Sequence, residues 1–253
     1  MTPEARERRR IRTPVVAVTA LAWVLLVLAD PPWSAPGAGH GAVMVPGMGH
    51  AGHEAGRSAT GLAIGGLLML TAMMAPLLIP AIRHARVRSL RRRRGRAVAL
   101  VVLAHAAVWA VGSALLLAVA SWLRAGTAQD AQAVLAGLVV AVTWQASPLK
   151  QTCLNRHCAT PPLACFGWRA DRDSLRFGAT HAAWCLGACW ALMLVALLVP
   201  AWHLAVMLLV SGWMWVEPFD RPARPSWRLR LPLRFLRIVA LRVRSVRKQV
   251  AAA

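Results

Sequence analysis

Residues 83–123 decide the fold: the basic stretch "RHARVRSLRRRRGR" (residues 83–96) runs directly into the apolar stretch "AVALVVLAHAAVWAVGSALLLAVASWL" (residues 97–123). The apolar stretch carries no Asp, Glu, Lys or Arg, and it is longer than the roughly 20 residues that a helix needs to cross a bilayer. Over the whole chain of 253 residues, 58% are hydrophobic and 15% are charged, and the apolar residues form long blocks. This composition predicts an integral membrane protein.

Equivalent apolar blocks lie on both sides of this stretch. The blocks predicted as helices cover residues 14–30, 61–82, 97–123, 132–149, 177–199 and 201–217. The expected fold is therefore all-α, a polytopic membrane helix bundle of about six transmembrane helices. The first block also has features of a signal peptide, since a basic region precedes it and small residues follow it, but an uncleaved anchor is favoured.

The basic residues alternate between loops, which gives the orientation. The net charge is +21, and Lys and Arg gather before the first block, between the second and third, between the fourth and fifth, and after the sixth. The connections near 31–60, 124–131 and 200 contain almost none. This positive-inside pattern predicts cytoplasmic termini in a multi-pass protein of a bacterial-type inner membrane. Because anionic headgroups attract such arginines, we expect membrane lipids, and not nucleic acid, as partners of the basic loops.

This topology divides the chain into four regions. They are the basic N-terminus with the first transmembrane helix (1–30), an extracytoplasmic His/Met-rich loop (31–60), a five-helix membrane core (61–220) that includes a cytoplasmic Cys-bearing loop (150–176), and a tail (221–253). The tail is basic and amphipathic, and it is expected to lie along the cytoplasmic face of the membrane.

The extracytoplasmic loop gathers metal ligands in the Gly/Ala-rich segment "HGAVMVPGMGHAGHEAG" (residues 40–56). Its candidate ligands are His40, Met44, Met48, His50 and His53. Imidazole suits copper, zinc or nickel, and thioether suits Cu(I), so the loop is a candidate collector of metal. The alternative is a solvated linker.

The second predicted helix carries "LTAMMAPLLIP" (residues 70–80), in which Met73 and Met74 precede Pro76 and Pro80. Each proline frees backbone carbonyls and kinks the helix. Adjacent methionines point about 100° apart, so at most one is expected to face any single partner. Both are candidate thioether ligands, with adaptable packing as the alternative.

The five cysteines lie between residues 153 and 189, outside the extracytoplasmic loops, so a disulfide framework is not expected. Cys153, His157 and Cys158 fall in the predicted cytoplasmic loop. Their C-x4-C spacing is looser than that of structural zinc ribbons. Two thiols and an imidazole this close in sequence are still candidates for one metal ion.

The fifth predicted helix holds a stripe of potential ligands. His181, Cys185 and Cys189 are four residues apart in turn, so they share one face of a helix. Gly178 would let another helix approach closely. We expect the stripe to face the methionines of the second helix and to bind metal. The alternative is that these side chains only pack. Glu217 ends the sixth helix, where a carboxylate is either a further ligand or a side chain that reaches the interface.

Four stretches resemble a known family in order and spacing: "MMAPLLIP" (73–80), "SPLKQTCLNRHC" (147–158), "RFGATHAAWCLGACWALM" (176–193) and the "VE" (216–217) that ends the last helix. They are similar to the predicted metal-binding integral membrane proteins of domain-of-unknown-function family 2182. The residues on the family pattern are Met73, Met74, Pro76, Pro148, Leu149, Lys150, Cys153, Cys158, Gly178, His181, Cys185, Gly187, Cys189, Trp190 and Met193. The resemblance implies metal binding without a defined reaction.

The chain departs from the family pattern at two positions. Ala188 stands where the family usually has a cysteine, which removes a possible ligand, and Pro218 stands where a lysine or arginine usually follows the last glutamate.

The leading hypothesis is a copper-handling membrane protein that binds, transfers or delivers Cu(I) together with a metal-donor or metal-acceptor protein. The predicted ligands become softer toward the bilayer centre, and a thiolate offsets the charge of Cu(I) there. Zinc, or no metal, is the alternative cofactor. Two other functions stay open: a membrane thiol oxidoreductase or oxidase-associated subunit, and a structural or assembly factor whose cysteines only pack. Catalysis is not favoured, since the sequence has no C-x-x-C and no phosphate-binding loop.

Overall fold

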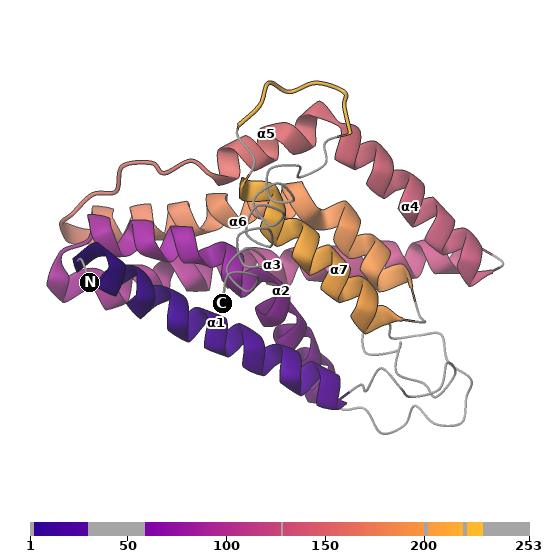
Figure 1. The fold of residues 1–253 in the computed structure, drawn as a ribbon, viewed down its shortest axis with the longest axis horizontal. Helices are drawn as coiled ribbons and strands as arrows, with labels where there is room; N and C mark the ends of the chain where they lie inside the picture. The colour runs from indigo at the N-terminus through magenta and orange to yellow at the C-terminus, as the bar shows by residue number, and fades with distance from the viewer. Residues whose placement is uncertain (1–2, 30–58, 128, 200–201, 220–221, 230–253) are drawn as a thin grey trace, which may run out of the picture.

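The computed structural model describes residues 3–29, 59–127, 129–199, 202–219 and 222–229 (Figure 1). These ranges are all-α, as expected, and contain no strand. The helices are α1 (Pro3–Ala29), α2 (Ala59–Arg88), α3 (Arg94–Ala125), α4 (Asp130–Ala146), α5 (Pro148–His157), α6 (Gly167–Leu198) and α7 (His203–Val216), with short 3-10 helices at Arg91–Arg93 and Glu217–Phe219. Each predicted apolar block overlaps one of these helices, and α5 is additional.

Four stretches of the described chain are helical, long and apolar enough to cross a membrane: Arg9–Leu28, Ile64–Arg88, Arg91–Ala125 and Gly167–Leu198. α4 and α5 count as a fifth if this pair, bent by 66°, is taken as one span. α7 is apolar but has only 14 residues, fewer than the about 20 that a straight crossing needs. The structure therefore supports four or five spans, and the sixth span and the cytoplasmic termini stay predictions.

The cytoplasmic loop predicted for residues 150–176 is largely helical. Pro148 lacks a backbone N–H, so α4 ends before it, and it takes a first-turn position of α5. The Ser147 hydroxyl caps α5, since it accepts a hydrogen bond from the backbone N–H of Lys150 at 3.2 Å. α6 begins at Gly167, well before the predicted apolar block, because its first turns are polar and hydropathy marks only the apolar part of a helix.

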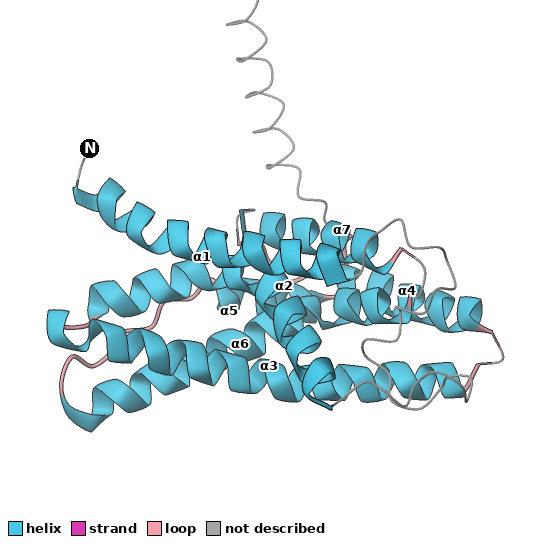
Figure 2. Cartoon of the chain, turned by 90° about the horizontal axis from the view of Figure 1, so that it is seen from below, coloured by secondary structure: helices cyan, strands magenta, loops and turns pink. Residues whose placement is uncertain are grey.

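α6 is the central helix of the fold. In its most apolar window 61% of the residues are buried, against 17% to 33% for the other three long apolar helices. It packs against α2, α3, α4, α5 and α7, and Figures 1 and 2 show it alongside α3. These two helices run in the same direction, since Val101 meets Gly178 near their N-termini and Arg124 meets Leu197 near their C-termini.

A glycine lets α3 and α6 approach closely, as predicted. A side chain at Gly178 would overlap the backbone of Val101. Near the N-terminus of α6, Asp171 also forms ion pairs with Arg93 at 2.7 Å and with Arg96 at 2.8 Å. Together these contacts hold α3 against the central helix.

Two tryptophans donate hydrogen bonds to backbone carbonyls of α2 just before Pro76. Pro76 cannot donate to the carbonyl of Ala72, four residues before it, and that carbonyl accepts a hydrogen bond from the Trp23 indole N–H at 3.1 Å. The next carbonyl, that of Met73, accepts one from the Trp215 indole N–H at 2.8 Å. α1 and α7 are thereby tied to α2 at the level of its methionines.

Candidate metal-binding site

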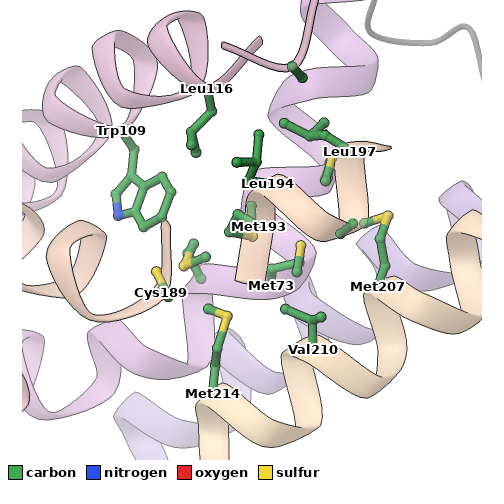
Figure 3. Packing of buried hydrophobic residues seen from close by; sticks show 14 of the residues in the cluster. Met73, Trp109, Leu116, Cys189, Met193, Leu194, Leu197, Met207, Val210 and Met214 are labelled. Carbon is green, nitrogen blue, oxygen red and sulfur yellow. The ribbon is translucent and has the colours of Figure 1, made fainter. Parts of the chain in front are cut away.

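Sulfur atoms concentrate in one buried cluster, which we call the sulfur core. Its members are Met69, Met73 and Met74 of α2, Cys185, Cys189 and Met193 of α6, and Met207 and Met214 of α7. They include every methionine that the structure describes, and none is more than 5% exposed. Figure 3 shows Met73, Cys189, Met193 and Met214 gathered between these helices. The interior of the fold therefore offers thioether and thiol groups from three helices.

The stripe of His181, Cys185 and Cys189 faces the interior. All three side chains are buried, and both cysteines share a cluster with the methionines of α2. The Cys189 thiol donates a hydrogen bond to the backbone carbonyl of Cys185 at 3.0 Å. Both cysteines are free thiols, so they are available as metal ligands once they lose their protons.

Met73 and Met74 both lie in the sulfur core, although adjacent side chains leave a helix in different directions. This is possible because α2 packs against α1, α3, α6 and α7, so both directions meet protein. Each methionine therefore presents its thioether to the interior.

Cys153, His157 and Cys158, the predicted ligands of this segment, have different surroundings. Cys153 packs against α6 at Gly187, where an added Cβ would lie 2.8 Å from Cys153 Sγ. The His157 ring stacks on the His181 ring with 4.1 Å between centroids. Cys158 is exposed and lines a cavity of about 260 Å³ together with these two histidines. Desolvation by the surrounding protein raises the pKa of the Cys158 thiol, so without metal it is protonated at neutral pH.

The expected three-ligand site of Cys153, His157 and Cys158 is therefore not assembled. Across the described ranges, no three His, Cys, Asp or Glu side chains lie close enough to hold one metal ion. Any metal site among these residues must use fewer such ligands or include methionine.

Glu217, predicted as a ligand or an interface residue, is buried in an ion pair. Its Oε1 atom pairs with the Lys150 ammonium group. The same oxygen accepts hydrogen bonds from the Trp213 indole at 2.6 Å and from the Gln145 amide at 3.4 Å. A buried charge needs such partners because it has lost its hydration. The charges of this pair also act electrostatically on the Cys189 thiol of the sulfur core.

The candidate ligands of the extracytoplasmic loop lie outside the described residues. They are His40, Met44, Met48, His50 and His53. Their role in collecting metal stays a prediction.

His105 of α3 is a site candidate that the sequence analysis missed. It is 3% exposed, and its ring centroid lies 5.8 Å from that of His181. A signal was present, because a titratable residue in the middle of an apolar span is by default a functional candidate.

Four methionines of the sulfur core were also overlooked as ligands: Met69, Met193, Met207 and Met214. Two of them follow or precede a predicted ligand by one helical turn, since Met69 precedes Met73 and Met193 follows Cys189 by four residues. The two methionines of α7 gave no such signal, because only the packing of α7 against α2 and α6 brings them near.

A comparison with known families gives one match. The family model described as "PpoB2: Copper chaperone" matches residues 64–229, a range that includes every residue of the sulfur core. No curated protein and no solved structure matches the chain. The match supports a copper-related family, as predicted.

Proposed function

We propose that the chain, which belongs to the PpoB2 family of copper chaperones, is a membrane protein that binds Cu(I) in its sulfur core and passes the ion to a partner protein. The observation that carries this proposal is the sulfur core itself. Thioether and thiolate are the ligands that select Cu(I). Six thioethers and two thiols in one buried cluster are a donor set suited to that ion.

The same donor set argues against zinc. Structural zinc sites use four ligands drawn from Cys, His, Asp and Glu. No three such side chains meet among the described residues. Methionine, which supplies most of the sulfur core, is not among the usual zinc ligands. Cu(I) therefore fits the ligands of the sulfur core better than Zn²⁺ does.

Binding at Cys189 or Cys185 keeps the charge of the core nearly constant. Cu(I) replaces the proton of a thiol, so one positive charge enters as another leaves. This matters because an uncompensated charge in an apolar interior is costly. The thioethers of Met73 and Met193 then complete the coordination without adding charge. Lys150 and Glu217 are paired with each other, so neither of their charges has to compensate the bound ion.

Apolar side chains on the outside of the bundle support a membrane location. Leu28 of α1 is 71% exposed, and Leu103 and Leu115 of α3 are each 63% exposed. In water, such surfaces would form large apolar patches, which soluble monomers rarely carry. In a bilayer these side chains contact lipid, as expected for spanning helices.

In the proposed orientation the termini are cytoplasmic, because the basic segments flank alternate helices. The His/Met-rich loop of residues 31–60 collects copper outside the membrane. The sulfur core holds it within the membrane, and Cys158 lies at the opposite end of the route. The donor and the acceptor are other proteins, as the role of a chaperone requires.

The test is the Cu(I) affinity of full-length protein in detergent, measured anaerobically by competition with a Cu(I) chelator. Cys189→Ala is expected to weaken binding by about 100-fold, which corresponds to about 2.7 kcal/mol. Met73→Leu combined with Met74→Leu is expected to weaken it by about tenfold, since thioether is the poorer donor. Cys165→Ala is the matched control, because Cys165 is an exposed thiol away from the core.

Equal affinity for Cys189→Ala and Cys165→Ala would contradict the proposal. If the Cys189→Ala protein kept its copper but Cys185 and Cys189 of the native chain cycled with oxidant, the thiol-oxidoreductase alternative would be favoured.

A further inference from the structure

Three histidines lie in a row where α3, α5 and α6 meet. The His105 and His181 ring centroids are 5.8 Å apart, and those of His181 and His157 are 4.1 Å apart. All three side chains are buried. His181 comes one helical turn before Cys185 of the sulfur core, and with His157 it lines the cavity that Cys158 reaches. The row therefore connects the sulfur core with the cavity.

Three nitrogen atoms in this row have no hydrogen-bond partner within the part of the chain that the structure describes. They are Nδ1 and Nε2 of His105 and Nε2 of His181. Each buried polar group without a partner costs about 1–3 kcal/mol. Packing alone does not account for His105, because an apolar side chain of similar size would fill the same space without that cost.

The spacing of His105 and His181 matches two imidazoles that share one ion. With metal–nitrogen bonds of about 2.0 Å and the two rings on opposite sides of the ion, the ring centroids lie about 6 Å apart. The observed separation is 5.8 Å. The rings are inclined by 40°, which a two-coordinate ion tolerates because each ring can rotate about its own metal–nitrogen bond.

The surroundings favour Cu(I) over a divalent ion. Two neutral imidazoles cannot compensate a charge, and the cost of burying an ion rises steeply with its charge. Zn²⁺ would also need further ligands, and the described residues offer no third His, Cys, Asp or Glu in range. Cu(I) carries one charge, accepts imidazole and is stable with two ligands.

The fold holds the two rings in place. The contact of Gly178 with the Val101 backbone sets the spacing of α3 and α6 one turn before His105 and His181. On the other side, the His157 ring stacks on His181, and its Nδ1 atom lies 3.5 Å from the His181 carbonyl oxygen. His157 thus supports the ring of His181 and leaves His181 Nε2 free.

We propose that His105 and His181 form a second Cu(I) site, distinct from the sulfur core, in which one ion is held between the two imidazoles. The inference rests on the proposed function, since it takes Cu(I) as the cargo. Cys185 lies about 6 Å along α6 from His181, so the ion can move between the sites by ligand exchange. In that step copper–nitrogen bonds form as the copper–sulfur bond breaks, and the thiolate left behind supplies the negative charge that balances the ion.

The test is copper stoichiometry and copper X-ray absorption of the full-length protein in detergent, loaded anaerobically with Cu(I). The parent protein carries His40→Ala, His50→Ala and His53→Ala, so that imidazoles of the loop do not contribute to the spectrum. His105→Leu is expected to bind one copper fewer per chain and to lose the imidazole scattering. Its apo form should be at least as stable as the parent, because the substitution removes two unpartnered nitrogens.

His84→Leu is the matched control. His84 packs against Phe177, as His181 does, but its Nε2 atom already lies 2.8 Å from the Pro161 carbonyl oxygen. This variant should keep the parent's stoichiometry and imidazole scattering.

The outcomes separate the two proposals. If His105→Leu keeps the full stoichiometry and the imidazole scattering while Cys185→Ala with Cys189→Ala loses copper–sulfur scattering, the histidine site is refuted and the sulfur core stands. A parent protein that binds no Cu(I) refutes both. Should His105→Leu fail to fold, His105→Gln is measured in its place, with the same expected loss of one copper.

Discussion

Cys189 is the central thiol of the proposed copper site. Its thiol lies in the sulfur core with thioethers from α2, α6 and α7. The charges of the Lys150–Glu217 ion pair act on this thiol electrostatically. The sequence predicted this residue and its stripe partners from their four-residue spacing. The spacing argument could not find His105, which has no ligand partner one turn away on its own helix, and only its position as a titratable residue in an apolar span pointed to it.

The Trp215 indole offers a test of how much its hydrogen bond to α2 contributes to stability. Trp215→Phe keeps an aromatic side chain but removes the pyrrole ring, whose N–H donates to the Met73 carbonyl. That carbonyl lies in an apolar interior, so we expect the free energy of unfolding to fall by about 1–3 kcal/mol. It is measured by denaturation of the detergent-solubilised protein. Trp122→Phe is the control, since Trp122 is 73% exposed, and equal stability of both variants would show that this hydrogen bond contributes nothing.

The pairing of α3 with α6 is the main interaction between elements. It brings His105 of α3 beside His181 of α6. It is also the most extensive contact between two helices of the described chain. Hydropathy located both helices, because each contains a long apolar block. It missed α5 and the first turns of α6, since these are polar helical segments whose existence depends on the Ser147–Pro148 boundary and on packing against α6.

Gly178→Ala tests that pairing directly. The new Cβ would overlap the backbone of Val101, so α3 must move away, and the free energy of unfolding should fall by about 1–3 kcal/mol. Gly212→Ala is the matched control, because an added Cβ at Gly212 meets nothing within 4 Å. That control should be neutral or stabilising by up to about 1 kcal/mol. A Gly178→Ala protein as stable as the Gly212→Ala protein would contradict the close contact.

The parallel direction of α3 and α6 agrees with the way in which basic loops alternate with loops that contain almost no Lys or Arg. Both helices follow a basic segment, so both are expected to leave the cytoplasm in the same sense. The loop of residues 31–60 and the tail of residues 221–253 were assigned by charge and composition alone, because neither contains an apolar block long enough to span the membrane.

Reporter fusions test this orientation. A reporter placed after Arg94 or at Ala253 is expected to be active as a cytoplasmic fusion, and one placed near Gly52 as an extracytoplasmic fusion, because Lys and Arg are retained on the cytoplasmic side. The measurement is the ratio of a phosphatase fusion to a cytoplasmic fluorescent fusion at each position. A cytoplasmic signal near Gly52 would overturn the orientation and the proposed copper-collecting role of the loop.

Binding of Cu(I) by the sulfur core is tested most directly by elemental analysis of the full-length protein, purified in detergent from copper-supplied cells. It is run beside Cys185→Ser combined with Cys189→Ser, and beside Cys165→Ser as a control for loss of a thiol. The sulfur core predicts bound copper in the native chain and in the Cys165→Ser protein, and a clear loss of copper from the double variant while it stays folded. Equal copper in all three proteins, or zinc in place of copper, would contradict the proposal that the sulfur core holds Cu(I).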